Sequence, residues 1–202
     1  MSEWFGQHLE DKWIVENLKL PKNGVFVEVG AYTGIAMSNT YHFEQKGWTG
    51  LCIEADPRHW GQLLMNRQCQ KFFGAAGSNP DLAFSMNPES SWSGFGREGT
   101  RVRVPVLTLR TLLEAYSLGP IDILSLDTEG TELDVWASGA FSEADPDYCT
   151  IRWPIYPRVV IIEWETAGLP SNKDRIRGHF ASLPYREVHE TVGNLIFERT
   201  YA

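Results

Sequence analysis

The chain has 202 residues and a mass of 22.9 kDa, which is the size of one domain. Its composition, 43% hydrophobic and 22% charged, is typical of a globular protein and argues against a disordered chain. The formal net charge of −8 disfavours a general nucleic-acid binder, which usually carries a basic surplus.

The sequence gives little indication of a membrane span, a signal peptide, a disulfide framework or a zinc site. No stretch approaches the ~18 apolar residues of a membrane span, and the first residues lack the basic and apolar regions of a signal peptide. We therefore expect a cytoplasmic protein. The three cysteines, Cys52, Cys69 and Cys149, are odd in number and lack a CxxC spacing, which argues against a disulfide framework or a zinc site.

Short β-branched runs alternate with longer amphipathic stretches along the chain. We expect strands at residues 24–29, 50–54, 71–75, 121–126 and 159–163, and helices at residues 10–20, 35–46, 58–67, 109–116, 132–137 and 173–183. Nearly continuous apolar runs such as Val-Val-Ile-Ile suit strands that are covered on both faces, as in a parallel sheet. The alternation predicts βαβ units and a doubly wound α/β sheet in one domain, residues 1–202, whose N-terminal helical segment spans residues 1–22.

Two regions depart from this alternation. Residues 185–190 and 194–199 flank Thr191-Val192-Gly193, which predicts an antiparallel hairpin that closes the edge of the sheet. Residues 77–101 are rich in Ser, Gly, Asn and Pro, and we expect a loop or short hairpin there, followed by a strand at residues 102–106. An insertion of this length is either a lid over an acceptor or a plain surface loop.

A glycine-containing turn follows the first expected strand, in Val27-Glu28-Val29-Gly30-Ala31-Tyr32-Thr33-Gly34. Glycines at a strand-to-helix turn let the backbone approach a ligand closely. Twenty-four residues after Gly30, the second strand ends in Glu54-Ala55-Asp56-Pro57. A carboxylate about 20 residues beyond such glycines suits the hydroxyls of a ribose, so the pair predicts a ligand with an adenosine-like half.

The acidic Glu28 at the end of the first strand bears on which ligand this is. A carboxylate there would repel a pyrophosphate but would suit the cationic amino group of S-adenosylmethionine. The turn also lacks the middle glycine of the dinucleotide pattern, which disfavours a nicotinamide-dependent dehydrogenase. A glycine-rich connection without any ligand is the remaining alternative.

Four segments carry a family resemblance: VFVEVGAYTG, Met37-Ser38-Asn39-Thr40, GWTGLCIEADP and IDILSLDTEGTELDVW. From about residue 11 to residue 197 the sequence resembles the FkbM-type methyltransferases, a branch of the class I S-adenosylmethionine-dependent enzymes. The most specific feature is Asp-x-Glu-Gly-x-Glu at residues 127–132, after the fourth expected strand.

The resemblance implies a fold, an activity and a set of site residues. The fold would be a Rossmann-like three-layer α/β/α sandwich with a mostly parallel seven-stranded sheet and an antiparallel edge hairpin. The activity would be transfer of a methyl group from S-adenosylmethionine to a hydroxyl oxygen of a small molecule, sugar or glycan. The implied cofactor-binding residues are Glu28, Gly30, Ala31, Tyr32, Gly34 and Asn39 near the methionine moiety, Glu54 with Ala55 at the ribose, Ala75 beside the adenine, and Asp127 near the methyl group. Tyr32 departs from the family, in which many members carry Asn.

Carboxylates follow the fourth and fifth expected strands, as Asp127 and Glu129 and as Glu163 and Glu165. Such groups can hold a divalent ion such as Mg²⁺, accept a hydroxyl proton, or cap a helix N-terminus. We expect Asp127 to be the general base, with Glu129 as the alternative, although Glu129 could instead brace the turn before Gly130. No ligand spacing demands a metal.

The histidines and the loop residues give weaker indications. His189 is a further candidate base, His59 is expected near the nucleoside, and His8, His42 and His179 are expected at the surface. Four arginines in or after the inserted loop could attract an anionic acceptor or simply be solvated: Arg97, Arg101, Arg103 and Arg110. Trp92 and Phe95 could stack on an acceptor ring or anchor the loop.

Two other functions share this fold. A nucleic-acid 2′-O-methyltransferase would need a Lys-Asp-Lys-Glu tetrad, but only Lys173 follows Lys71, beyond the fifth strand, so a nucleic-acid partner is disfavoured. A non-catalytic nucleoside-binding scaffold is the other alternative. The chain has little material for an acceptor pocket, so the inserted loop, the N-terminal helix or a second subunit of a homodimer would have to form it.

Overall fold

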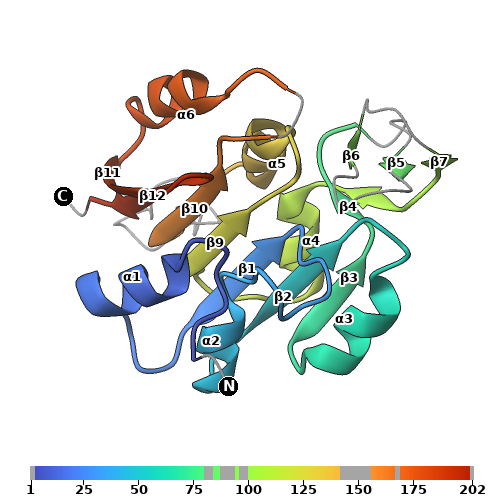
Figure 1. Ribbon diagram of the computed structural model, residues 1–202, viewed down its shortest axis with the longest axis horizontal. Coiled ribbons are helices and arrows are strands. Elements are labelled where there is room, and N and C mark those ends of the chain that lie inside the picture. The colour runs from blue at the N-terminus through green and yellow to red at the C-terminus, as the bar shows by residue number, and fades with distance from the viewer. Residues whose placement is uncertain are drawn as a thin grey trace, which may run out of the picture.

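A seven-stranded sheet lies at the centre of the computed structural model, which describes residues 3–79, 84–86, 94–95, 100–141, 156–166 and 169–200 (Figure 1). The strands lie in the order β11-β12-β10-β9-β1-β2-β3. Five neighbours run parallel: β1 (Val25–Val29), β2 (Thr49–Glu54), β3 (Gln70–Phe73), β9 (Ile123–Leu126) and β10 (Val159–Glu163). The edge hairpin is β11 (Tyr185–Glu190) and β12 (Asn194–Arg199), and β12 pairs antiparallel with β10.

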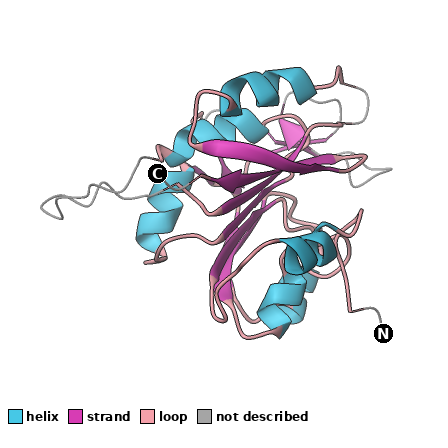
Figure 2. Cartoon of the chain, turned by 90° about the vertical axis from the view of Figure 1, so that its left-hand side faces the viewer, coloured by secondary structure: helices cyan, strands magenta, loops and turns pink. Residues whose placement is uncertain are grey.

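Helices cover both faces of this sheet (Figure 2). One core cluster packs β-strand side chains such as Phe26 and Ile161 with residues of α1 (Glu10–Asn17), α2 (Tyr41–Gln45) and α3 (Trp60–Asn66). The other cluster packs Val27 and Ile162 with residues of α4 (Leu109–Ala115), α5 (Glu132–Gly139) and α6 (Lys173–Phe180). Adjacent strand residues thus face opposite helix layers. The expected three-layer α/β/α fold with its antiparallel edge hairpin is confirmed.

The helix expected at residues 35–46 is wrong over its first half, because α2 begins only at Tyr41. Residues 35–40 form a loop in which Met37 has a left-handed backbone, with φ of 60°. The polar groups of Ser38, Asn39 and Thr40 donate hydrogen bonds to the carboxylate of Glu28. A buried carboxylate therefore takes the donors that would otherwise start a helix.

The inserted region contains small strands of its own. β4 (Ala75–Ala76) pairs in parallel with β8 (Val106–Leu107). β5 (Phe84–Met86), β6 (Gly94–Phe95) and β7 (Thr100–Val102) form a three-stranded antiparallel sheet. The strand expected at residues 102–106 is therefore wrong: it is divided between two sheets, with Pro105, which has no N–H to donate, at the break.

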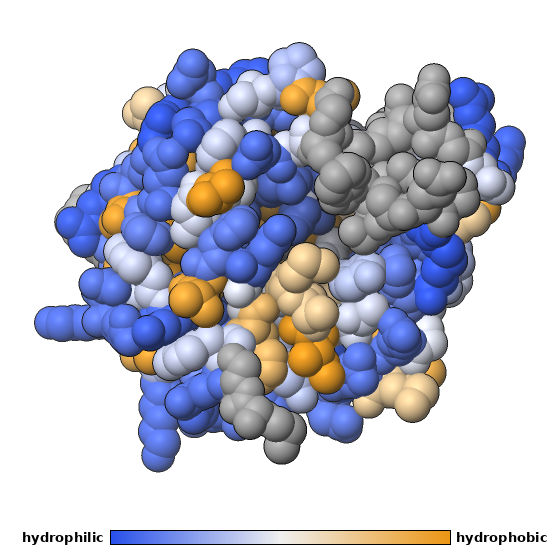
Figure 3. Space-filling view, viewed as in Figure 1, coloured by the Kyte–Doolittle hydropathy of each residue, from blue (hydrophilic) through white to orange (hydrophobic). Residues whose placement is uncertain are grey.

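Several further features bear on the sequence expectations. Among the described helices, none combines the length and the hydropathy needed to cross a membrane. Cys52 and Cys69 are free thiols whose Sγ atoms lie 3.5 Å apart, and Cys149 lies outside the described residues. On the face seen in Figure 3, hydrophilic side chains predominate and a small group of apolar side chains lies near the middle.

Gly30 is the point at which β1 leaves the sheet beside β9. Its φ is 85°, and a Cβ atom there would lie 1.7 Å from the carbonyl oxygen of Asp127. Only glycine lets the backbone turn this close to the neighbouring strand.

We expect Gly30→Ala to destabilise the fold by at least about 3 kcal/mol, since the methyl group adds a left-handed strain and displaces the β9 backbone. Thermal unfolding followed by circular dichroism measures this. Gly61→Ala is the matched control, because Gly61 is exposed within α3 and nothing lies within 4 Å of its added Cβ. It should raise stability by about 0.5–1 kcal/mol through helix propensity. Equal melting temperatures for the two variants would contradict this account of the turn.

Candidate active site

A cavity of about 370 Å³ opens at the edge where the parallel strands end. Ligands of open α/β sheets bind outside the carboxyl ends of the strands, so the cavity lies where the fold favours one. The residues of its wall that the sequence pointed to are Glu28, Gly30, Ala31, Tyr32, Glu54, Ala55, Ala75, Asp127, Glu129, Glu163 and Glu165.

The turn after β1 is tied directly to the end of β2. The backbone N–H of Tyr32 donates to Oε2 of Glu54 at 2.6 Å, and Tyr32 has a φ of 50°. Asn adopts this left-handed region more readily than Tyr, which gives a backbone reason for the Asn that many FkbM-type sequences carry here. The Tyr32 ring packs edge-on against His59, with the centroids 4.3 Å apart.

Glu54 is a buried acceptor at the end of β2. Its side chain is 6% exposed, and its Oε1 accepts the backbone N–H of Asp56 at 2.6 Å. Burial raises the pKa of Glu54 to about 7, although the two backbone N–H groups act in the opposite direction. Each carboxylate oxygen keeps a second lone pair, so the group can still accept hydrogen bonds from ligand hydroxyls.

Glu28 is paired with a buried arginine that the sequence did not single out. Nη1 of Arg67 lies 2.9 Å from Oε2 of Glu28, and the Arg67 residue is only 1% exposed. The same guanidinium donates to the carbonyl of Gly34 and to the hydroxyl of Thr40, and it also pairs with Glu44. Burial is the largest single influence and lowers the pKa of Arg67, but its neighbours, led by Glu28, together outweigh burial. The pKa of Arg67 therefore lies above its usual value. Arg67 follows α3 with no motif around it, so no sequence signal could have found it.

Three residues that the resemblance places at the cofactor also make contacts within the protein. The Glu28 carboxylate reaches the cavity wall but is occupied by Arg67 and the loop of residues 38–40. The Asn39 amide donates to the hydroxyl of Ser125 at 3.1 Å, and Gly34 packs against Arg67. Neither Asn39 nor Gly34 is among the described residues of the cavity wall. All three hold the loop in place behind the cavity.

Three carboxylates meet at the ends of β9 and β10. Oxygen atoms of Asp127, Glu129 and Glu163 lie within 4.8 Å of one another, and the carboxyl groups of Asp127 and Glu163 are hydrogen-bonded. Burial and the nearby charge of Glu129 raise the pKa of Asp127 to about 8, and burial beside Asp127 also raises the pKa of Glu163. Two like charges this close cannot both ionise easily, so the pair keeps a proton near neutral pH.

Glu132 braces the turn after β9. Its Oε1 accepts hydrogen bonds from the backbone N–H groups of Thr128 and Gly130, at 3.0 and 2.8 Å. Glu129 has a left-handed backbone, with φ of 59°, and lines the cavity. Glu132 thus provides a brace for this turn, and Glu129 lies at the cavity wall beside Asp127 and Glu163.

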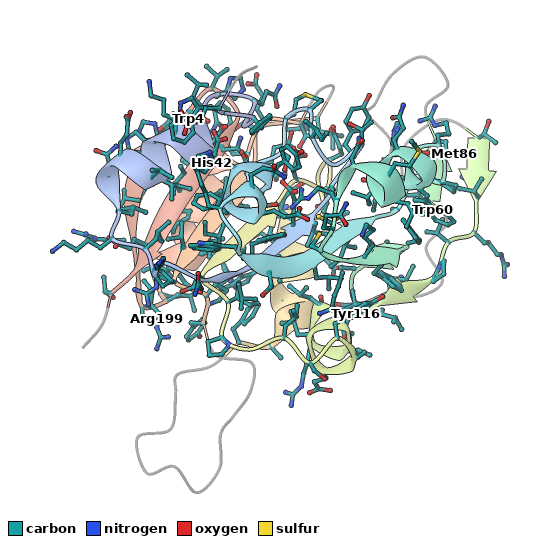
Figure 4. The ribbon with its side chains drawn as sticks, turned by 90° about the horizontal axis from the view of Figure 1, so that it is seen from below. Trp4, His42, Trp60, Met86, Tyr116 and Arg199 are labelled. Carbon is teal, nitrogen blue, oxygen red and sulfur yellow. The ribbon has the colours of Figure 1, made fainter. Side chains whose placement is uncertain are left out.

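The histidines divide between the cavity and the rest of the fold. His59 lines the cavity beside Tyr32. His8 was expected at the surface, but it is half-buried and also lines the cavity. His42 was expected at the surface too, but it is buried and stacks on Trp4, as the pair labelled in Figure 4 shows. His189 stacks on Trp13 and is absent from the described cavity wall, whereas His179 is exposed as expected.

The basic residues that the structure describes in and after the inserted region do not line the cavity. Arg101, Arg103 and Arg110 are exposed and lie outside its described wall, and Arg110 pairs with Glu114. Trp92, Arg97 and the side chain of Phe95 lie outside what the structure describes. The described wall holds seven carboxylates and neither Lys nor Arg; the carboxylates are Glu28, Glu54, Asp56, Asp127, Glu129, Glu163 and Glu165. This part of the cavity favours a cationic ligand.

A family model described as the methyltransferase FkbM domain matches residues 28–186. The chain belongs to the FkbM methyltransferase family. The matched span includes the glycine turn, Glu54 and the carboxylates after β9 and β10, so most of the described cavity wall belongs to the methyltransferase domain. The family indicates an enzyme that transfers methyl groups.

Two solved structures are similar to this chain to different degrees. A chain of the fibrillarin/Nop5p complex is similar with a TM-score of 0.54 at 8% identity, over 98% of this chain and 82% of that chain. Precorrin-6y C5,15-methyltransferase from Geobacter metallireducens gives a TM-score of 0.48 at 8% identity, over 95% of this chain and 87% of that chain. No curated protein matches the sequence. The first likeness supports a class I methyltransferase fold.

Asp127→Asn should stabilise the protein in a chelator-containing buffer. Folding raises the pKa of Asp127 from near 4 to about 8. The stability that the protonated carboxyl gives is therefore complete below about pH 4 and is lost as the pH rises through about 8. The amide cannot ionise, so the variant should gain on the order of 2 kcal/mol over the wild type at pH 8 and little at pH 4. Urea unfolding at both pH values measures this.

Asp174→Asn is the control, since Asp174 is exposed on α6 and should shift stability by less than about 0.5 kcal/mol. A wild-type advantage over Asp127→Asn at pH 8 would contradict the buried proton pair.

Proposed function

We propose that this protein transfers the methyl group of S-adenosylmethionine to a hydroxyl oxygen of a small molecule, sugar or glycan. One observation carries the proposal. A proton-holding pair, Asp127 with Glu163, shares a single cavity with the turn at Gly30 and the buried acceptor Glu54. A group that binds a nucleoside and a group that takes up a proton therefore face the same space.

The wall residues fit S-adenosylmethionine in shape and in charge. Glu54 offers two fixed oxygens to the ribose hydroxyls, and Gly30, Ala31, Tyr32, Ala55 and Ala75 supply close backbone or small side-chain contacts. The carboxylate-rich wall suits a sulfonium cation and disfavours the pyrophosphate of a dinucleotide. We assign Glu28, Gly34 and Asn39 to support of the loop beneath the cofactor, since their polar groups face Arg67 and Ser125.

Bound S-adenosylmethionine would supply an electrophilic methyl group, and its transfer to oxygen is an in-line displacement. The protein's main contribution is to align the acceptor hydroxyl with that methyl group. Asp127 takes the hydroxyl proton onto a carboxylate oxygen, with Glu163 sharing it and Glu129 as the neighbouring alternative. Because a base works best when its pKa lies near the working pH, the raised pKa of Asp127 suits this role.

The same three carboxylates are spaced to hold a divalent cation in place of the shared proton. Mg²⁺ at this position would require Asp127 and Glu163 to ionise, so its binding would release protons. Addition of MgCl₂ to chelator-treated protein in weak buffer distinguishes the two arrangements. A pH drop that is lost in Glu129→Gln supports the metal, and an unchanged pH supports the proton pair alone.

The charge of the cavity also bears on the acceptor. Seven carboxylates in the described wall disfavour an anionic acceptor, including a nucleic-acid backbone. Lys173 pairs with Glu190 and lies over the ring of Trp164, away from that wall, which weakens the tetrad of a 2′-O-methyltransferase further. A non-catalytic scaffold would bind the cofactor but transfer no methyl group. The binding and transfer experiments below therefore distinguish a scaffold from an enzyme.

Calorimetric titration of the protein with S-adenosylhomocysteine tests the cofactor, with NADH as the control ligand. We expect binding at micromolar concentrations for the first and no heat for the second, because the described part of the wall offers ribose acceptors but neither Lys nor Arg for a pyrophosphate. Binding of NADH, or silence with both ligands from a folded sample, would overturn the proposed cofactor.

Glu54→Gln should weaken S-adenosylhomocysteine by about tenfold at pH 8, since a charge-assisted contact to the ribose is lost. In the wild type, hydroxyl donors favour the ionised form of Glu54, so affinity should rise between pH 6 and pH 8, through the pKa of about 7. The variant should show no such rise. Titrations at both pH values measure this, and a pH-independent wild type would contradict the role of Glu54.

Asp127→Asn should retain S-adenosylhomocysteine binding but lower methyl transfer by about a hundredfold. The wild-type rate should rise with pH up to about 8 as Asp127 ionises. Radiolabelled methyl transfer to a panel of sugar and small-molecule alcohols measures both. Full activity of the variant would exclude Asp127 as the base.

A further inference from the structure

The segment that precedes α1 closes one end of the cavity. Gly6 forms a parallel β-bridge with Met37 in the loop after β1, and Gln7 and His8 line the cavity wall. The imidazole of His8 also lies against the β11–β12 turn, since a Cβ on Gly193 would be 3.3 Å from its Nε2 atom. This segment lies outside residues 28–186, the part of the chain that matches the family.

Buried carboxylates hold this segment in place. Glu10 is fully buried, and its Oε2 accepts the backbone N–H of His8 at 2.9 Å. Its Oε1 accepts hydrogen bonds from the hydroxyl of Thr191 and the amide of Asn194, at 3.0 and 2.9 Å. The backbone of His8 is thus tied to the hairpin that flanks the cavity.

A second carboxylate fixes the chain just before His8. Asp11 is also fully buried, and its Oδ2 accepts the backbone N–H of Phe5 at 2.7 Å. The Phe5 ring packs edge-on against Tyr41 of α2, and Trp4 stacks on His42 (Figure 4). None of these contacts uses the imidazole of His8, so the backbone that carries the ring is fixed while the ring itself can meet a ligand.

The composition of the wall shows what such a ring would bind. The proposed cofactor carries a carboxylate on its amino-acid portion, and that anion must enter a cavity whose described wall holds seven carboxylates and neither Lys nor Arg. Two imidazoles, His8 and His59, are the side chains of that wall that can become cationic donors. His59 packs on Tyr32 beside Glu54, at the nucleoside end. His8 lies by Gly193, which precedes β12 on the far side of β9 and β10.

We propose that His8 binds the amino-acid carboxylate of S-adenosylmethionine, so that a segment outside the family domain completes the cofactor site. The proposal rests on the proposed function, since it places that cofactor in the cavity. The imidazole donates a hydrogen bond to the carboxylate, and Gln7, the preceding residue, also lines the cavity.

A pair of ligands tests this without any acceptor. S-adenosylhomocysteine carries the amino-acid portion, and 5′-methylthioadenosine lacks it. His8→Ala should weaken S-adenosylhomocysteine by about tenfold and leave 5′-methylthioadenosine unchanged. His8→Gln, which keeps an N–H donor, should recover part of the loss. Calorimetry measures all four affinities, and thermal unfolding should give both variants the wild-type melting temperature.

Two histidine variants serve as controls. His179→Ala, at an exposed position on α6, should leave both affinities unchanged. His59→Ala should affect the two ligands equally, because His59 lies at the nucleoside end.

The outcomes separate this inference from the proposed function. If the wild type binds neither ligand, the proposed cofactor fails and the role of His8 fails with it. If the wild type binds both ligands and His8→Ala changes neither affinity, or weakens both equally, the cofactor stands and the role of His8 is overturned. If binding is unchanged but methyl transfer falls, His8 serves the acceptor, and its assignment to the carboxylate is equally overturned.

Discussion

The ion pair between Glu28 and Arg67 is the interaction on which the cavity depends. It joins the end of β1 to the end of α3, and the remaining donors of the guanidinium hold the loop between them at Gly34 and Thr40. Both side chains are almost fully buried. Removing one partner of a buried pair leaves the other charge uncompensated, at a cost of about 3–5 kcal/mol. The loop beneath the cavity is therefore held by electrostatics and not by helix propensity.

Glu28 has a cationic partner, whereas the carboxylates on the cavity side of that loop are close to one another. Asp127, Glu129 and Glu163 are gathered without a cation among the described residues of the cavity wall, and Asp127 and Glu163 have raised pKa values. Such an arrangement lowers the stability of the unliganded protein at neutral pH, and it persists because the sheet and helices hold the strand ends together. Carboxylates that are costly to ionise in the empty site are well suited to a cationic ligand and to proton uptake.

Much of the fold followed from local pattern. The five parallel strands were expected because continuous apolar runs indicate burial on both faces, and the edge hairpin was expected from the two runs around Gly193. Gly30 and Glu54 follow neighbouring parallel strands, whose carboxyl ends lie at one edge of the sheet. Both residues therefore line one cavity. The helix expected from residue 35 failed because Glu28 takes its donors, which is a contact between segments far apart along the chain.

The sequence by itself determined the parallel strands, the edge hairpin, the glycine turn and the carboxylates at the strand ends. These features depend on apolar runs and on motifs within single segments. Tertiary structure alone decided that Arg67 neutralises Glu28, that Glu132 braces the β9 turn, and that His8 reaches the cavity. Each of these depends on contacts that a polar residue makes with other segments of the chain. A lone polar residue carries no periodic signal, and only the packed layers show which partner it finds.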